Sequence, residues 1–185
     1  MKQTVRRSLT VSLLMTVLVL ILPYLAPPKL VLRFLPKDIY EAGRNHPAPS
    51  KKRQLLGHIL TLIFFAYFIC IMKKNADEIQ RENLGFPEAF KRLAAFLYVE
   101  KVFDIIVLDQ FLCMTSGWFQ RFYPETKDCA GWHNRGWNNR QQAARLLIYP
   151  LVCAVQAHLL TKGNDHDCPA DDKAVPADKN AAESC

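Results

Sequence analysis

Four ionisable residues lie within one apolar stretch of this chain. The stretch AFLYVEKVFDIIVLDQFLCM, residues 95–114, has the length and apolar content of a membrane-spanning helix, yet it contains Glu100, Lys101, Asp104 and Asp109. Ionisable groups inside membrane spans usually serve function, by moving protons or cations or by anchoring a ligand between helices. These four residues are therefore candidate binding residues, and Asp109 is also a candidate catalytic residue.

The spacing of these residues indicates where their helix must lie. At 100° per residue, Glu100 and Asp104 lie about 40° apart, whereas Asp109 lies opposite Glu100. Lys101 precedes Asp104 by three residues, which allows an ion pair within the helix. Because each mid-span Asp or Lys costs about 2.5–3.5 kcal/mol, the helix is unfavourable when it faces lipid on its polar sides. We expect it at the centre of a bundle or beside a wet cavity.

Two histidines in other apolar segments are candidate partners for these carboxylates. His58 lies near the start of QLLGHILTLIFFAYFICIM, and His158 lies near the end of LLIYPLVCAVQAHLLT. If consecutive spans run antiparallel, His158 reaches the depth of Glu100 and His58 reaches the depth of Asp109 at the other end. The sequence predicts the pairs Glu100–His158 and Asp109–His58, with both histidines as binding residues.

A second group of candidates lies in residues 118–140, which hold all three tryptophans. Tryptophans prefer the head-group layer, which predicts an aromatic loop along the membrane surface. Arg135 and Arg140 can hold a phosphate or carboxylate in bidentate fashion, and His133 can act as an acid or base. With Asp109 beneath them, these residues predict an interfacial site for an amphiphile with an anionic head. No HExxH motif or nucleophile elbow is present, and no motif identifies a cofactor.

The distribution of apolar residues predicts an all-α polytopic membrane protein. Four segments are long or apolar enough to serve as transmembrane helices packed in a bundle: residues 8–28, 54–72, 93–115 and 144–161. Residues 1–162 then form one membrane domain. Residues 163–185 are rich in Asp, Ala, Asn and Pro with few apolar residues, which predicts a disordered acidic tail.

The first apolar segment has two interpretations. Lys2, Arg6 and Arg7 precede it, as in a cleavable signal peptide, but LPYLAPPK follows it without a small-x-small cleavage site. We expect a retained anchor. Lys and Arg are almost equally numerous in the loops of the two sides, so orientation depends on the N-terminal charges, which favour a cytoplasmic N-terminus.

The net charge of +7 does not indicate a nucleic-acid-binding protein. Basic residues lie at the ends of the apolar runs, as in KKR at residues 51–53 and KR at residues 91–92. Cations at such positions meet lipid head groups. The expected partners are the lipid bilayer and another membrane protein or a second copy of this chain, with no nucleic acid.

The six cysteines and the tail do not define a metal site. Cys113 and Cys129 flank one end of the third apolar segment and allow a disulfide if that end faces an oxidising compartment. The stretch DHDC at residues 165–168 contains metal-ligand residue types, but no second cluster at a fixed spacing completes a site. We predict no metal site.

Three function classes follow from these residues. We expect a non-catalytic or assembly subunit whose charged third span docks against a membrane partner through Glu100, Lys101, Asp104 and Asp109. One alternative is a proton- or cation-coupled carrier or channel subunit that uses the same carboxylates. A second alternative is a membrane-embedded enzyme that acts on a lipid or isoprenoid head group at residues 118–140.

Overall fold

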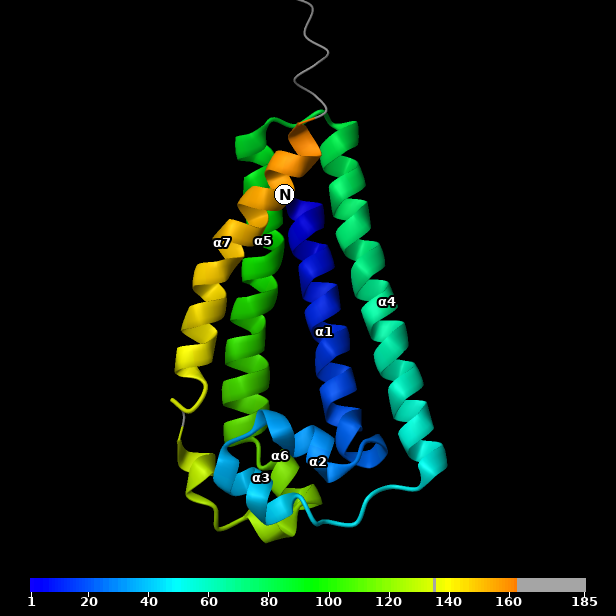
Figure 1. Cartoon of the computed structure of the whole chain (residues 1–185), viewed down its shortest axis with the longest axis vertical. Helices are drawn as coiled ribbons and strands as arrows, with labels where there is room; N and C mark the ends of the chain where they lie inside the picture. The colour runs from blue at the N-terminus through cyan, green and yellow to red at the C-terminus, as the bar shows by residue number, and fades with distance from the viewer. Residues whose placement is uncertain (135, 163–185) are drawn as a thin grey trace, which may run out of the picture.

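The computed structural model describes residues 1–134 and 136–162, and helices joined by short loops make up most of these ranges (Figure 1). No strand occurs within these ranges. In chain order the helices are α1 (Lys2–Leu25), α2 (Pro28–Val31), η1 (Leu32–Phe34), α3 (Lys37–Gly43), α4 (Lys51–Arg81), α5 (Phe86–Phe103), η2 (Asp104–Thr115), α6 (Trp118–Phe122), η3 (Pro124–Thr126), η4 (Ala130–His133) and α7 (Asn139–Thr161). The predicted acidic tail, residues 163–185, lies outside the described residues.

Three helices are long and apolar enough to cross a membrane: α1, α4 and α7. Their length and composition are consistent with a multi-pass membrane protein. The charged segment forms one continuous helix through α5 and η2, residues 86–115, and its charged residues set it apart from the other three.

Prolines and a turn residue with positive φ explain where several of these helices begin and end. Ala26 is extended (φ −106°, ψ 150°) because it precedes Pro27, so α1 ends before the predicted residue 28. The helix α4 extends beyond the predicted span to Arg81, and Asn83 then reverses the chain with a positive φ of 49°. Pro87 lies in the first turn of α5, where its missing N–H costs nothing.

The long helices alternate in direction, and α5 lies between α1 and α7 (Figure 1). The helix α4 contacts the other side of α1. Small residues allow close approach between α5 and α7, where Ala89, Cys153 and Ala157 are fully buried. Large apolar side chains remain exposed on the outer faces, for example Leu62 (70%) on α4 and Leu147 (79%) on α7. Such outer faces suit a hydrocarbon solvent.

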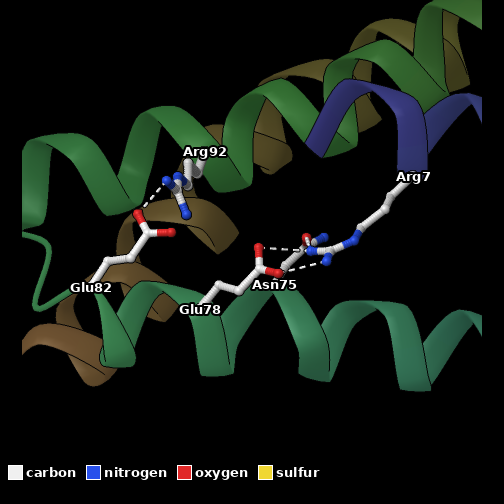
Figure 2. Close-up of polar contacts among 5 residues, drawn as sticks. All are labelled: Arg7, Asn75, Glu78, Glu82 and Arg92. Atoms are coloured by element: carbon white, nitrogen blue, oxygen red, sulfur yellow. Dashed lines mark hydrogen bonds and ion pairs between the residues drawn. The ribbon is translucent and has the colours of Figure 1, made fainter. Parts of the chain in front are cut away.

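A polar cluster joins three helices at the end of the bundle where the N-terminus lies (Figure 2). Arg7 of α1 donates to both carboxylate oxygens of Glu78 on α4, at 2.5 and 2.8 Å, and to Asn75 Oδ1 at 3.0 Å. Arg92 of α5 donates to Glu82 Oε2 at 2.5 Å. The bidentate pair fixes both distance and angle between α1 and α4.

The opposite end of the bundle is covered by short helices, which we call the cap: α2, η1 and α3 from residues 28–43, and α6, η3 and η4 from residues 118–133. Leu32, Ile39, Tyr123 and Trp132 form its buried core. The Trp132 indole N–H donates to the Thr126 carbonyl at 2.6 Å. Trp132 therefore packs inside the cap and does not lie along the membrane surface as predicted.

The two halves of the cap are held together by Asp38. The Gly131 N–H donates to Asp38 Oδ2 at 2.7 Å, and a Cβ at Gly131 would collide with this carboxylate and with Pro36 Cβ. This close approach explains the glycine in the sequence CAGWHN.

Candidate functional site

The charged helix changes its winding at Asp104, where the α-helix α5 becomes the π-helix η2. An i→i+5 helix turns through a smaller angle per residue than an α-helix, so residues five apart come close to one face. Asp104 and Asp109 are five apart, and both face the same cavity together with Glu100. The prediction that Asp109 lies on the side opposite Glu100 assumed α-helical geometry through residue 109, whereas the helix is a π-helix from Asp104 to Thr115.

This cavity has a volume of about 970 Å³ and is lined by α1, α5, η2, α7 and the cap. The α1 wall is apolar, with Met15, Val19 and Leu22. The other walls carry both signs of charge beside apolar side chains such as Leu108 and Phe119. The charged residues are Glu100, Lys101, Asp104 and Asp109 from α5 and η2, Arg145 from α7, and Arg33, Lys37 and Asp38 from the cap. Four cations and four carboxylates therefore border a cavity whose α1 wall is apolar.

Lys101 and Asp104 form the predicted ion pair. Lys101 is 2% exposed, and its Nζ lies 2.5 Å from Asp104 Oδ2. Lys101 carries the most deeply buried charge among the described residues, and its partner Asp104 lies within one turn of the same helix.

Asp109 is held by two amides from the start of α7. Asn138 Nδ2 donates to Asp109 Oδ2 at 3.1 Å, and Gln142 Nε2 donates to the same oxygen. A carboxylate can only accept, so both amides must turn their NH₂ groups toward it. Their carbonyl oxygens, Asn138 Oδ1 and Gln142 Oε1, are consequently buried without a donor among the described residues. Buried polar atoms are normally satisfied, so these two are the unexplained acceptors of the site.

Three other charges in the cavity, Glu100, Arg145 and Arg33, have no hydrogen-bond or ion-pair partner among the described residues. Glu100 is half-buried on α5, and no hydrogen bond or ion pair joins it to another described side chain. Arg145, also without such a bond, lies on α7 one turn before the cavity residue Tyr149. Free charges of both signs are thus available to a bound molecule.

The cavity is closed toward the N-terminal end of the bundle. Val11, Ile71 and Phe96 form a buried apolar cluster from α1, α4 and α5, one turn beyond Glu100. Ser8 donates to the Phe96 carbonyl at 2.8 Å in the same layer. The polar space therefore ends inside the bundle and does not continue as a conduit through this layer.

The predicted carboxylate–histidine pairs are not formed in the structure. His58 on α4 and His158 on α7 are both exposed, and neither lines the cavity. Asp109 takes its hydrogen bonds from Asn138 and Gln142 instead. The two histidines were predicted by depth alone, and depth does not fix the side of the helix on which a residue lies.

The loop candidates His133 and Arg140 are not gathered around Asp109. His133 at the end of η4 and Arg140 in the first turn of α7 are exposed and do not line the cavity. Arg135 lies outside the described residues. Cys113 lines the cavity, and the Cys129 thiol donates to the Asp38 carbonyl at 3.7 Å, so both are free thiols and the allowed disulfide is not formed. Partial burial, with Asp38 and Asp128 nearby, raises the pKa of Cys129.

Glu125 is the carboxylate of the cap whose titration is most clearly shifted by a partner. His46 Nδ1 lies 2.9 Å from Glu125 Oε1, and this hydrogen bond holds the pKa of Glu125 below its ordinary value of 4.5. The contact ties the end of the first loop to η3, next to the buried ring of Tyr123, whose pKa is raised by burial to about 12.

Sequence reasoning missed the cavity residues of α7. Asn138 and Gln142 are four apart at the start of a helix, a spacing that places both on one face. That pair of amides before an apolar run was a usable signal. No equivalent signal marks Arg145 and Tyr149 as cavity residues. No group of three or more His, Cys, Asp or Glu side chains within residues 1–134 and 136–162 is arranged to hold a metal ion.

The fold and cavity define the class of protein only broadly: an all-helical chain with three helices able to cross a membrane. No family model matches the sequence, and no curated protein or solved structure is significantly similar to it.

Proposed function

We propose that this protein binds an amphiphilic molecule in the cavity between α1, α5, η2 and α7. The observation that carries the proposal is the juxtaposition of the apolar wall of Met15, Val19 and Leu22 with charged walls of both signs. An apolar ligand would leave those charges unmatched, and a purely polar ligand would gain nothing from the α1 wall. An amphiphile satisfies both.

The location of the cavity supports the same proposal. Its polar lining extends from the middle of the charged helix to the cap, where Arg33 and Lys37 border it. In a membrane this is the depth range over which a lipid changes from head group to acyl chain. The volume of about 970 Å³ lies at the upper end of the range for small-molecule sites.

The proposal requires that α5 and η2 together act as a fourth span. Thirty residues in one continuous helix between α1 and α7 are sufficient to cross a hydrocarbon core. We propose a four-span bundle with the N-terminus, the turn near Asn83 and the end of α7 on one side, and the cap on the other. The N-terminal charges favour the cytoplasm for the first side.

The cavity supports ligand binding better than the two classes that were expected first. A docking partner would need Glu100, Lys101, Asp104 and Asp109 on an outer face of the bundle, whereas these side chains line the cavity between the helices and the cap. A channel would need a continuous polar path, whereas the Val11–Ile71–Phe96 layer interrupts it. Docking of a membrane partner and cation coupling stay predictions.

Two tryptophan substitutions on α1 test the proposal. Val19 lines the cavity, whereas Val17 is 51% exposed on the outer face of the same helix. Val19→Trp should fill the cavity, and Val17→Trp adds the same bulk outside it. Native mass spectrometry of the purified chain should show bound lipid in the wild type and in Val17→Trp, with at least a fivefold loss in Val19→Trp, on the order of 1 kcal/mol. Equal occupancy in both variants, or no bound lipid in the wild type, would overturn the proposal.

A further inference from the structure

The carboxylate of Asp109 lies in a group of hydrogen-bond acceptors that lacks donors. The NH₂ groups of Asn138 and Gln142 both donate to one oxygen of Asp109. This leaves Asn138 Oδ1 and Gln142 Oε1 buried without a donor among the described residues. Gln142 is only 6% exposed, and both residues line the cavity. The group therefore holds two buried amide oxygens without donors beside a negative charge.

The orientation of the amides does not depend on an arbitrary choice of nitrogen and oxygen. Exchanging the O and N atoms of Gln142 would bring its carbonyl oxygen against a carboxylate oxygen, which would repel it. The same holds for Asn138. Both acceptors therefore remain unsatisfied for as long as Asp109 is ionised, and a ligand can satisfy them only by bringing N–H or O–H donors.

We infer that the head group of the bound amphiphile carries a primary ammonium group that sits against Asp109, Asn138 and Gln142. An –NH₃⁺ group offers three donors and a positive charge, which match two amide oxygens and one carboxylate. A trimethylammonium group carries the same charge but has no N–H. It would keep the attraction to Asp109 and leave both amide oxygens unpaired. This inference rests on the proposed function and names the chemistry of its ligand.

The neighbouring Trp137 indicates what lies beside the amine. Its indole N–H is buried without an acceptor among the described residues, and the residue lines the same cavity. A phosphate or hydroxyl oxygen next to the ammonium group would accept from it. Arg33 and Lys37 border the cavity from the cap, where an anionic oxygen has further partners. The combination describes an ethanolamine-phosphate type of head group.

Three probes distinguish this inference from the proposed function. The purified full chain is titrated with lysophosphatidylethanolamine, with lysophosphatidylcholine of the same acyl chain, and with glycerophosphoethanolamine, which lacks the chain, and binding is measured by native mass spectrometry. The ethanolamine lysolipid should bind about tenfold more tightly than the choline lysolipid, equivalent to about 1.4 kcal/mol. The chainless probe should bind more weakly than either lysolipid.

A pair of variants on α7 assigns the preference to the site. Gln142→Leu removes the buried acceptor and should reduce the tenfold preference to about twofold or less, on the order of 0.4 kcal/mol. Gln156→Leu makes the same change at a glutamine of α7 that also carries a buried unpaired oxygen but lies outside the cavity, and it should keep the preference.

Each contradictory outcome identifies what fails. Equal binding of the two lysolipids would overturn the amine inference and leave amphiphile binding intact. Binding of the chainless probe as tightly as the ethanolamine lysolipid would overturn the amphiphile and leave the amine site. Absence of binding by all three would overturn both, and retention of the preference in Gln142→Leu would overturn the assignment to these residues.

Discussion

Lys101 is the most deeply buried charged side chain among the described residues. Replacing it with Met would leave Asp104 in a partly buried position without its ion-pair partner. We expect Lys101→Met to lower the free energy of unfolding by about 3 kcal/mol, because an unpaired charge in a protein interior is costly. The control Lys91→Met removes an exposed pair with Glu88 and should change stability by less than about 0.5 kcal/mol.

Unfolding of both variants in mixed micelles, followed by tryptophan fluorescence, measures this difference. The double variant Lys101→Met/Asp104→Asn should recover much of the loss, since it removes both charges of the pair. Equal stabilities of Lys101→Met and Lys91→Met would contradict the burial of the Lys101 pair.

Glu125 gives a prediction for the dependence of cap stability on pH. Its pKa in the folded protein is lowered from the ordinary value of 4.5, chiefly by the hydrogen bond with His46. A lowered carboxyl pKa contributes stability that is present above about pH 4.5 and is lost as the pH falls through the folded value. The wild type should therefore melt at a higher temperature than Glu125→Gln near pH 6, and the difference should disappear as the pH falls through the lowered pKa of Glu125. A difference that is unchanged at low pH would contradict the contact.

Single residues also show the limits of the sequence. The Lys101–Asp104 pair was predicted correctly because three residues in a helix fix their own separation. The partners of Asp109 were not, because Asn138 and Gln142 lie 29 and 33 residues later along the chain. Their approach depends on how the cap folds, which no local spacing reports.

At the scale of helices, the Arg7–Glu78 contact makes the strongest prediction. Glu78→Gln replaces a bidentate ion pair between α1 and α4 with neutral hydrogen bonds, at a site where both side chains are less than one third exposed. We expect a loss of about 1–2 kcal/mol in the free energy of unfolding. Glu82→Gln breaks the pair with Arg92, in which the carboxylate is 48% exposed, and should cost less.

The charge-exchanged variant Arg7→Glu/Glu78→Arg separates an interhelical contact from a requirement for Glu78 itself. It should recover part of the stability lost in Glu78→Gln. A double variant that is less stable than both single substitutions would argue against direct pairing of the two side chains.

Helix positions were predictable from apolar runs, but helix winding was not. The predicted spans at 54–72 and 144–161 lie inside α4 and α7, and the observed ends follow from proline and turn residues nearby. The sequence DIIVLDQFLCMT is compatible with both an α-helix and a π-helix, and it contains no residue pattern that predicts the π-helix. That change of winding begins at Asp104, and Asp109, one turn later, lines the cavity. The sequence therefore identified the carboxylates as candidate residues, but it did not predict the cavity that they line together.

At the scale of the whole molecule, the number of spans is testable by cysteine labelling. Asn83, in the turn between α4 and α5, and Lys127, between η3 and η4 of the cap, are both exposed and lie on either side of α5 and η2 along the chain. In a cysteine-free background, Asn83→Cys and Lys127→Cys should react with a membrane-impermeant maleimide from opposite sides of the membrane. Labelling of both from one side would mean that the charged helix does not cross.

The same labelling decides the orientation. We predict that Asn83→Cys lies on the cytoplasmic side and Lys127→Cys on the other, in line with the N-terminal charges. Reaction of Lys127→Cys only after the cells are opened would reverse that orientation and leave the number of spans unchanged.

The most direct measurement is to map where a photoreactive lysolipid attaches to the protein in a membrane. A probe with its reactive group near the head should form crosslinks to residues 100–113 and 138–149, which hold the cavity residues of α5, η2 and α7. An excess of unlabelled lysolipid should suppress these crosslinks. Attachment confined to the outer faces of α4 and α7, around Leu62 and Leu147, would show that lipid only surrounds the bundle and would contradict an amphiphile-binding cavity.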